Sequence, residues 1–268
     1  MANRRVGATA LSCLGSILLA GCSEASPPPE KPEDKPPLAL MTTLPVYWPE
    51  TGGFGELLDQ NGERPWMRTE VERSYRLEPL DYLSQEALAP FDRLLLAQPR
   101  ALSAEENVAL DTWVRDGGQL LLFADPLVTM HSRYGLGDRR RPQAVALLSP
   151  ILARWGLELA FDPDQGDGAR TVTAFDIALP VDVAGTLEAV ATDAPGKCVL
   201  SQAGHAARCE IGKGRVLAIA DTAVLDPGHG GHGAHGNDVD EAGGDQHEAG
   251  GDAQSAALGR LLAMSFGQ

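Results

Sequence analysis

Short apolar runs alternate with amphipathic stretches along the middle of the chain. Two runs, residues 93–97 and 119–124, have the length of a strand and are apolar almost throughout. Between them, Leu110 and Val114 fall on one face of a helical pattern that spans residues 103–117. Strands this apolar that are joined through a helix are typical of a parallel sheet covered on both faces. We therefore predict a strand, helix and strand unit with a right-handed crossover.

The helix of this unit has recognisable ends. Ser103 is followed by Glu106, the pattern of a capping box in which the hydroxyl accepts the Glu106 N–H and the carboxylate bonds back. Gly117 supplies the left-handed residue that ends the helix. The capping residues and the periodicity therefore predict the same helix.

The flanking pattern predicts further elements of an α/β domain. Before the unit we expect a strand over residues 38–43, a helix around 54–60 and a strand near 75–77; after it, a surface loop over 131–142, a helix over 144–155 and a strand over 157–161. Beyond Pro163, short alternating runs separated by turn residues indicate antiparallel strands. These runs cover residues 171–175, 185–191, 198–201, 208–211 and 215–220, and a helix over 256–266 closes the chain.

The N-terminal residues are typical of an export signal. Arg4 and Arg5 precede an apolar run over residues 11–20 that is too short to span a membrane. Residues 19–22, LAGC, resemble the bacterial lipobox, in which the cysteine, here Cys22, is lipidated; an ordinary signal peptide is the alternative. Ser23 at the next position resembles lipoproteins sorted to the outer membrane. We expect a periplasmic, membrane-anchored protein, with the outer membrane favoured over the inner.

The predicted organisation is therefore a signal peptide (1–22), a linker (23–37) and one domain (38–268). Prolines favour an extended, unpacked chain in the linker. The net charge of −15 at pH 7 repels phosphate backbones, so nucleic acid is not an expected partner.

Two cysteines remain once the signal is removed and Cys22 is lipidated. Cys198 and Cys209 lie on successive predicted strands in an oxidising compartment, which favours a cross-strand disulfide. Two free, buried thiols are the alternative.

A histidine-rich stretch of low complexity precedes the last helix. Residues 227–252, rich in Gly, Asp and Glu, contain His229, His232, His235 and His247. Imidazoles at this spacing beside carboxylates are competent ligands for Zn²⁺ or Cu²⁺, although the glycines leave no preformed geometry. We expect a flexible insertion, with weak zinc or copper capture as the alternative to a purely solvated segment; no other cofactor is expected.

Candidate ligand-binding residues follow from the rule that ligands gather beyond the carboxyl ends of parallel strands. The candidates are Thr43, Tyr47, Gln98, Arg100, Asp125 and Asp221. Asp125 and Asp221 fit a metal or sugar-hydroxyl site, or caps of the loops that follow their strands. With the basic run 139–141 in the loop above them, they predict a groove with an acidic floor and a basic lid. No nucleophile follows the strand that ends at Phe123, so we predict that the chain is not an enzyme.

Three landmarks of the domain resemble a known family. They are Gly117-Gly118 before a strand ending at Asp125, Trp155-Gly156 with Glu158, and residues 212–215, GKGR, before a strand ending at Asp221. Over residues 38–226 the chain resembles the GldG-like domain of uncharacterised ABC-type transport systems. The resemblance implies a flavodoxin-like or class I amidotransferase-like α/β fold: a mainly parallel central sheet, helices on both faces and a small antiparallel β addition in the C-terminal half.

The resemblance also implies a function. Family members usually carry transmembrane helices beside the domain, whereas this chain has a predicted lipid anchor. We expect a lipid-anchored periplasmic binding or assembly component of an ABC-type envelope transport system, with transporter subunits as partners. The alternative is a metal-binding lipoprotein that uses the histidine-rich stretch; a hydrolase using Asp125 and Asp221 around a metal is the third hypothesis.

Overall fold

The computed structural model describes residues 34–51, 64–166, 168–193, 196–226 and 244–267. These described residues belong to one compact unit. The predicted signal peptide, most of the linker and the predicted helix around 54–60 lie outside the described residues.

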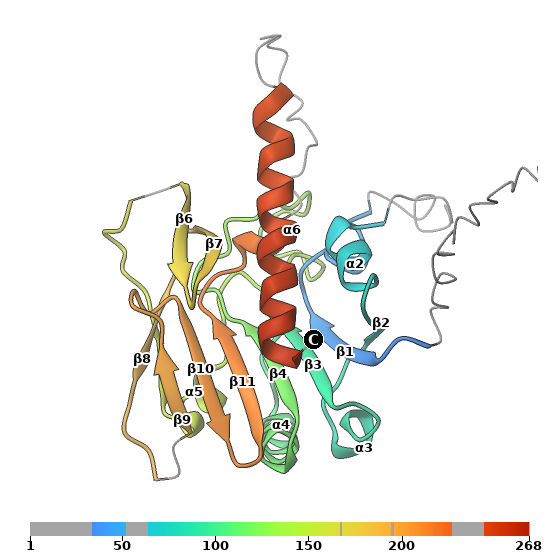
Figure 1. Cartoon of the computed structure of the whole chain (residues 1–268), viewed down its shortest axis with the longest axis vertical. Helices are drawn as coiled ribbons and strands as arrows, with labels where there is room; N and C mark the ends of the chain where they lie inside the picture. The colour runs from blue at the N-terminus through green and yellow to red at the C-terminus, as the bar shows by residue number, and fades with distance from the viewer. Residues whose placement is uncertain (1–33, 52–63, 167, 194–195, 227–243, 268) are drawn as a thin grey trace, which may run out of the picture. The chain divides into compact units, whose positions relative to one another are not determined.

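A seven-stranded sheet in the order β2-β1-β3-β4-β11-β10-β9 forms the centre of this unit (Figure 1). Its strands are β1 (Pro37–Thr42), β2 (Arg76–Pro79), β3 (Arg93–Ala97), β4 (Gln119–Phe123), β9 (Lys197–Leu200), β10 (Ala206–Ile211) and β11 (Gly214–Ile219). The five strands from β2 to β11 are parallel, and their order is that of a flavodoxin-like sheet with β11 in fifth place. The predicted α/β fold is confirmed.

The central prediction of two neighbouring, co-directional strands is also confirmed. β3 pairs with β4 in parallel, with Leu94 opposite Leu120 and Leu96 opposite Leu122. All four leucines are fully buried. Their apolar character follows from helices on both faces of the sheet.

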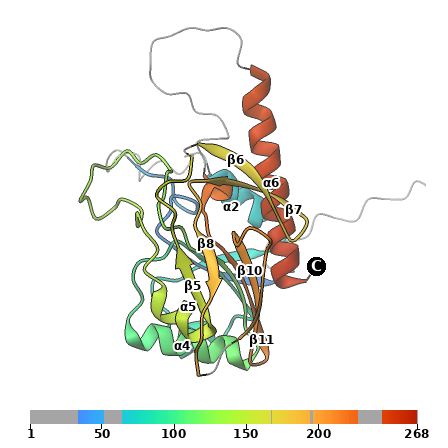
Figure 2. The same ribbon diagram turned by 90° about the vertical axis from the view of Figure 1, so that its left-hand side faces the viewer.

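Helices cover the two faces in separate layers, and Figure 2 shows α6 on one side of the sheet with α4 and α5 on the other. The helices are α2 (Trp66–Val71), α3 (Gln85–Leu88), α4 (Ala104–Asp116), α5 (Ser149–Trp155), the 3₁₀ turn η2 (Ala223–Leu225) and α6 (Gly244–Phe266). Leu95 and Leu121 share a core cluster with Leu261 of α6. Leu94 and Leu120, one position away on each strand, share the other core with α3, α4 and α5.

The ends of α4 are those that its sequence predicts. Ser103 Oγ accepts the N–H of Glu106, and Glu106 Oε2 accepts the N–H of Ser103, so the capping box is complete. Gly117 ends the helix at a φ of 131°, which a residue with a side chain rarely adopts.

Two predicted helices differ in length from those observed. The helix predicted over 144–155 begins only at Ser149, because Pro150 is tolerated in a first turn but not in a helix interior. Before it, the N–H of Ala146 donates to the carbonyl of Asp125 instead. The last helix begins at Gly244, inside the segment expected to be flexible, and not at Ala256.

The C-terminal half carries the predicted antiparallel addition. Two small sheets pair β5 (Leu157–Ala160) with β8 (Thr186–Ala189) and β6 (Ala169–Ala174) with β7 (Ile177–Asp182). Beyond them, β10 and β9 extend the main sheet antiparallel to β11. The sequence pattern did not predict β7, α2 or α3.

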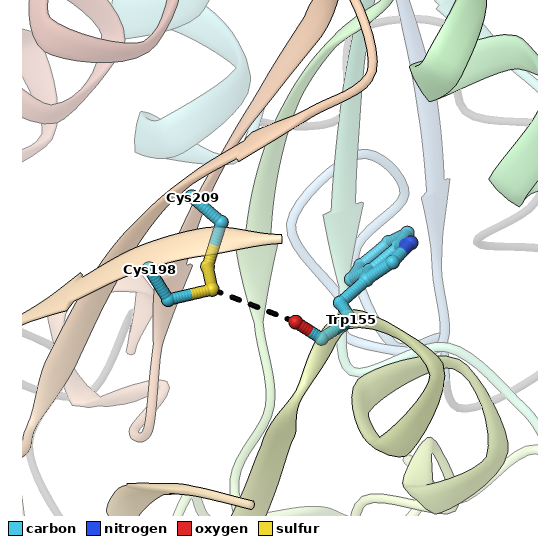
Figure 3. The surroundings of a disulfide bond; sticks show 3 residues. All are labelled: Trp155, Cys198 and Cys209. Carbon is cyan, nitrogen blue, oxygen red and sulfur yellow. Dashed lines mark hydrogen bonds between the residues drawn. A yellow bond between two sulfur atoms is a disulfide. The ribbon is translucent and has the colours of Figure 1, made fainter. Parts of the chain in front are cut away.

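The predicted disulfide is present between Cys198 of β9 and Cys209 of β10 (Figure 3). The two residues face each other in the strand register, with Cα atoms 4.0 Å apart. Cys198 Sγ lies 3.7 Å from the carbonyl oxygen of Trp155 at the end of α5. The bridge therefore joins the edge strand β9 to its neighbour β10, on the face of the sheet that packs against α3, α4 and α5.

Candidate functional site

Hydrogen bonds connect the carboxyl ends of β3 and β4 through Gln98. This residue follows β3, is fully buried and has a φ of 43°. Its Nε2 donates to the carbonyls of Asp125 and Gln143, and its Oε1 accepts the N–H of Asp125 at 2.9 Å. The amide thus connects two strand ends, and both its Nε2 and its Oε1 are bonded within the protein.

Thr43 brings the end of β1 into the same network. Its Oγ1 donates to the carbonyl of Gln98 at 2.6 Å and accepts the N–H of Gln143 at 3.0 Å. Because Gln143 follows the 131–142 loop, these bonds fix the end of that loop over the sheet.

Asp125 connects the end of β4 to the residues after β11. Its Oδ2 accepts the N–H of Thr222 at 3.0 Å and the hydroxyl of Thr222 at 2.6 Å, while its Oδ1 accepts the N–H of Leu127. Burial raises the pKa of the Asp125 carboxyl above its usual value.

Asp221 connects β11 to β7. Its Oδ2 accepts the N–H of Asp182 at 2.8 Å, and its Oδ1 accepts the N–H of Ala223. Burial first, and then the charge of Asp125, raise the pKa of Asp221 to about 8. All four carboxylate oxygens of Asp125 and Asp221 thus accept hydrogen bonds, which gives both residues a structural role; their ligand-binding role remains a prediction.

Arg100 lies apart from this network. Its guanidinium makes a two-pronged contact with the buried carboxylate of Glu106, with both N–O distances at 2.8 Å, and also donates to the backbone carbonyl of Asp81. Despite the burial of Glu106, hydrogen bonds from Arg100, Ser103 and Leu83 lower its pKa to about 2. Arg100 therefore holds the start of α4 in place through its contact with Glu106.

A pocket opens beyond the carboxyl ends of β1 and β2, with a volume of about 260 Å³. Its lining residues are Leu40, Thr42, Thr43, Leu44, Pro45, Tyr47, Trp48, Pro49, Glu50, Pro79, Leu80, Asp81, Tyr134 and Arg140. Of the six predicted ligand-binding residues, Thr43 and Tyr47 line this pocket. The pocket lies beyond the carboxyl ends of parallel strands, beside the β1/β3 switch point at which sheets of this strand order bind ligands.

One wall of the pocket is aromatic. Trp48 is 67% exposed and meets Tyr47 edge to face, with ring centroids 4.8 Å apart. The guanidinium of Arg68 covers a face of Tyr47 at 4.1 Å from the ring centroid and lies 5.3 Å from that of Trp48. Arg68 is itself paired with Glu72 at 2.8 Å. Trp48 thus contacts Tyr47 and Arg68, while most of its surface is exposed to solvent.

The predicted loop over the strand ends forms the opposite wall. Glu50 accepts hydrogen bonds from the Ser132 hydroxyl at 2.6 Å and the Arg133 N–H at 2.7 Å. The Tyr134 hydroxyl donates to the carbonyl of Thr51 and accepts its N–H. These contacts hold the loop against the segment that follows β1.

The two carboxylates predicted to form an acidic floor, Asp125 and Asp221, do not line this pocket. Asp125 and Asp221 are buried and bonded to backbone N–H groups, so the carboxylates that line the pocket are Glu50 and Asp81. The basic lid is represented by Arg140, which lies 4.3 Å from the Tyr134 ring centroid and pairs with Asp138. The strand-end rule misses Asp81 because β2 continues to Pro79, beyond its predicted end.

The remaining predicted sites lie outside the part of the chain whose side chains are described. These are Cys22 and the four histidines His229, His232, His235 and His247. Within the described part, no three Asp, Glu, His or Cys side chains gather in a way that could hold a metal ion. No helix of that part is long and apolar enough to cross a membrane.

Comparison with known families agrees with the resemblance seen in the sequence. Residues 35–165 match the model of a family described as an ABC-type uncharacterized transport system. This span contains the strand, helix and strand unit, the 131–142 loop and every residue that lines the pocket. A search of curated proteins gave no match.

Solved structures share parts of the fold at low similarity. A catalytic mutant of the GH42 beta-galactosidase Gan42B from G. stearothermophilus is 13% identical over 69% of this chain and 27% of that chain, with a TM-score of 0.40. The exo-beta-1,4-mannosidase Op5Man5 from Opitutaceae bacterium strain TAV5 is 13% identical over 84% and 36%, with a TM-score of 0.42. The cytoplasmic protein STM1381 from Salmonella typhimurium LT2 is 13% identical over 85% and 98%, with a TM-score of 0.38. The chain thus spans less than two thirds of either enzyme, and similarity this low supports no inference about activity.

Proposed function

Because residues 35–165 carry the domain of the ABC-type uncharacterized transport system family, we propose that this chain is a lipid-anchored, non-catalytic binding component of such a system. The family match is the observation that carries the proposal. It supports a role as an auxiliary component of a transport system, and the lipobox-like residues 19–22 supply the proposed anchor.

The arrangement of the strand ends supports a binding role. Gln98, Asp125 and Asp221 direct their polar atoms to other parts of the protein, which holds the loops in place. The adjacent pocket combines an exposed aromatic ring with a few polar groups on a fixed frame, the usual composition of a ligand site.

Purification from membranes tests the transport role. The full chain, tagged at its C-terminus and solubilised in detergent, is expected to bring down an ATPase subunit and a permease subunit. An unrelated lipoprotein of similar abundance serves as the control. Repeated recovery of the chain without any transporter subunit would contradict the association.

The anchor is tested separately with Cys22→Ser. The wild-type chain is expected in the membrane fraction, with the mass of a lipid on Cys22, and to sediment with outer-membrane markers. The variant is expected to lose the lipid and leave the membrane fraction. A wild-type chain whose N-terminal peptide carries no lipid would refute the anchor but leave the transporter association intact.

A further inference from the structure

The pocket beyond β1 and β2 has a fixed shape before any ligand arrives. Glu50 is bonded to Ser132 and Arg133, and Tyr134 is bonded to both backbone atoms of Thr51. Both walls are therefore connected to each other through hydrogen bonds. A ligand that binds here gives up little free energy to order the walls.

The charged groups around the pocket are largely paired within the protein. Arg140 pairs with Asp138, and Arg68 pairs with Glu72, each at 2.8 Å. Both oxygens of Glu50 accept hydrogen bonds from the loop. A phosphate or carboxylate ligand would therefore find no unpaired cation among these residues and would meet the carboxylate of Asp81.

The aromatic rings do not form a cage for a cation. Such a cage needs open ring faces, but Arg68 and Arg140 already lie 4.1 Å and 4.3 Å from the ring centroids of Tyr47 and Tyr134. Arg68 also lies 5.3 Å from the ring centroid of Trp48, but this ring is 67% exposed and provides most of the open aromatic surface of the pocket. A single flat platform suits a ligand with one flat apolar face.

Two polar groups beside this platform are available for hydrogen bonds. Asp81 and Tyr47 both line the pocket, and neither the Asp81 carboxylate nor the Tyr47 hydroxyl is hydrogen-bonded to another residue of the described chain. A carboxylate accepts bonds from hydroxyl groups, and a phenol both donates and accepts. A flat apolar face edged with hydroxyl groups is the chemistry of a sugar ring.

We infer that this pocket binds a saccharide, whose C–H face stacks on Trp48 and whose hydroxyl groups bond to Asp81 and the Tyr47 hydroxyl. The inference rests on the proposed binding function and names its ligand class. The volume of about 260 Å³ suits one sugar ring, so a longer saccharide would extend into solvent past Trp48. Asp81 also lies beside Arg100, whose guanidinium donates to its backbone carbonyl and fixes its position.

Calorimetric titration of the purified full chain with cellotriose, maltotriose and chitotriose tests the inference. At least one trisaccharide is expected to bind with a Kd of about 1 mM or tighter, while inorganic phosphate and tetramethylammonium do not bind. Tryptophan fluorescence should shift to shorter wavelength on binding, because a sugar removes water from Trp48.

Matched variants locate the site. Trp48→Ala is expected to weaken trisaccharide binding at least about tenfold, Trp48→Phe less, and Asp81→Asn by roughly five- to tenfold. Val199→Ala, a truncation of another exposed apolar side chain on the opposite edge strand, should leave the Kd within about twofold. Trp48 is exposed, so its variants should keep the wild-type melting temperature.

Three results would overturn the inference: no trisaccharide binds, Trp48→Ala binds as tightly as the wild type, or only phosphate or tetramethylammonium binds. Each is measured on the isolated chain. A negative result in the sugar titrations would therefore not affect the proposed association with a transporter. In the same way, failure to recover transporter subunits would not affect the sugar-binding result.

Discussion

Single carboxylates decide how this fold responds to pH, and Glu106 shows one direction of the effect. Its side chain is fully buried and accepts hydrogen bonds from Arg100, Ser103 and Leu83. These donors lower its pKa to about 2. The capping box predicted from sequence is thus part of a larger set of hydrogen bonds to Glu106. The other donors are the N–H of Leu83, just before α3, and the guanidinium of Arg100.

Replacing Glu106 with Gln is expected to lower the free energy of unfolding by about 2–3 kcal/mol, because a buried amide cannot accept from all these donors. A lowered folded-state pKa stabilises the protein above the usual pKa of 4.5, and this stability is lost as the pH falls toward 2. Urea unfolding at pH 7 and pH 3 measures both effects. Glu105→Gln, an exposed change in the same turn, is the control; an equal loss in both variants would contradict the assignment.

Asp221 shows the opposite direction. Its pKa is raised to about 8, so the folded protein keeps a proton that the unfolded chain releases near its usual pKa of 3.8. The free energy of unfolding should therefore fall as the pH rises from about 4 to 8, by up to ~1.4 kcal/mol per pH unit. Asp221→Asn should flatten this slope in urea unfolding measured across that range. A wild-type stability that rises steadily from pH 4 to 8 would disagree with this account.

The residue scale also marks a limit of sequence analysis. Gln98 was recognised by its position after a strand, but its role depends on Asp125 and Gln143, which are distant in the chain. Its backbone is left-handed, with a φ of 43°, but the residue is not a glycine, so the sequence gives no sign of this conformation. Neighbouring residues in the sequence were enough to predict the roles of Ser103 and Gly117. The bonds of Gln98 form only when the sheet brings distant residues together.

Among the elements, apolar strands with regular helices between them were predictable, and short or proline-containing elements were not. The bounds of β3 match the prediction because the four residues that follow Arg93 are all apolar. In contrast, α3 spans only four residues, which is too short for a helical period. β7 alternates regularly, with Ile177, Leu179 and Val181 buried, but Pro180 lies between them and a proline argues against a strand in the sequence.

The β9–β10 hairpin gives the prediction at this scale. Removing its bridge with Cys198→Ala and Cys209→Ala should lower the free energy of unfolding by roughly 2–3 kcal/mol, since the closed loop is short. The transition temperature, measured with and without reductant, reports the change. Reductant should lower the wild-type value and leave the double variant unaffected; equal sensitivity of the two proteins would mean that the bridge does not stabilise the fold.

For the whole molecule, the fold class followed from the sequence, but only two residues of the pocket, Thr43 and Tyr47, did. Buried parallel strands need two helical layers, and that requirement is visible in the apolar runs. The pocket needs Tyr47, Asp81 and Tyr134 to meet from three separate segments. No local pattern encodes such a meeting.

The histidine-rich stretch, which lies outside the described side chains, gives a prediction for the intact chain. If it captures metal, titration of the full chain with Zn²⁺ or Cu²⁺ should release or absorb heat at micromolar protein. The signal should vanish when His229, His232, His235 and His247 are all replaced with Ala. An unchanged signal in that variant would mean that the metal binds elsewhere in the chain. No heat with the wild-type chain would refute the hypothesis.

The position of β11 has a consequence for how the chain is made. β4 lies between β3 and β11, yet β11 emerges long after β4, following the hairpins of the C-terminal half. During synthesis, one edge of the leucine-rich β4 is therefore exposed without its neighbouring strand, open to pairing with other chains. The parallel part of the sheet is complete only when β11 has been made, so a chain cut short before Gly214 should aggregate and not fold as a smaller domain.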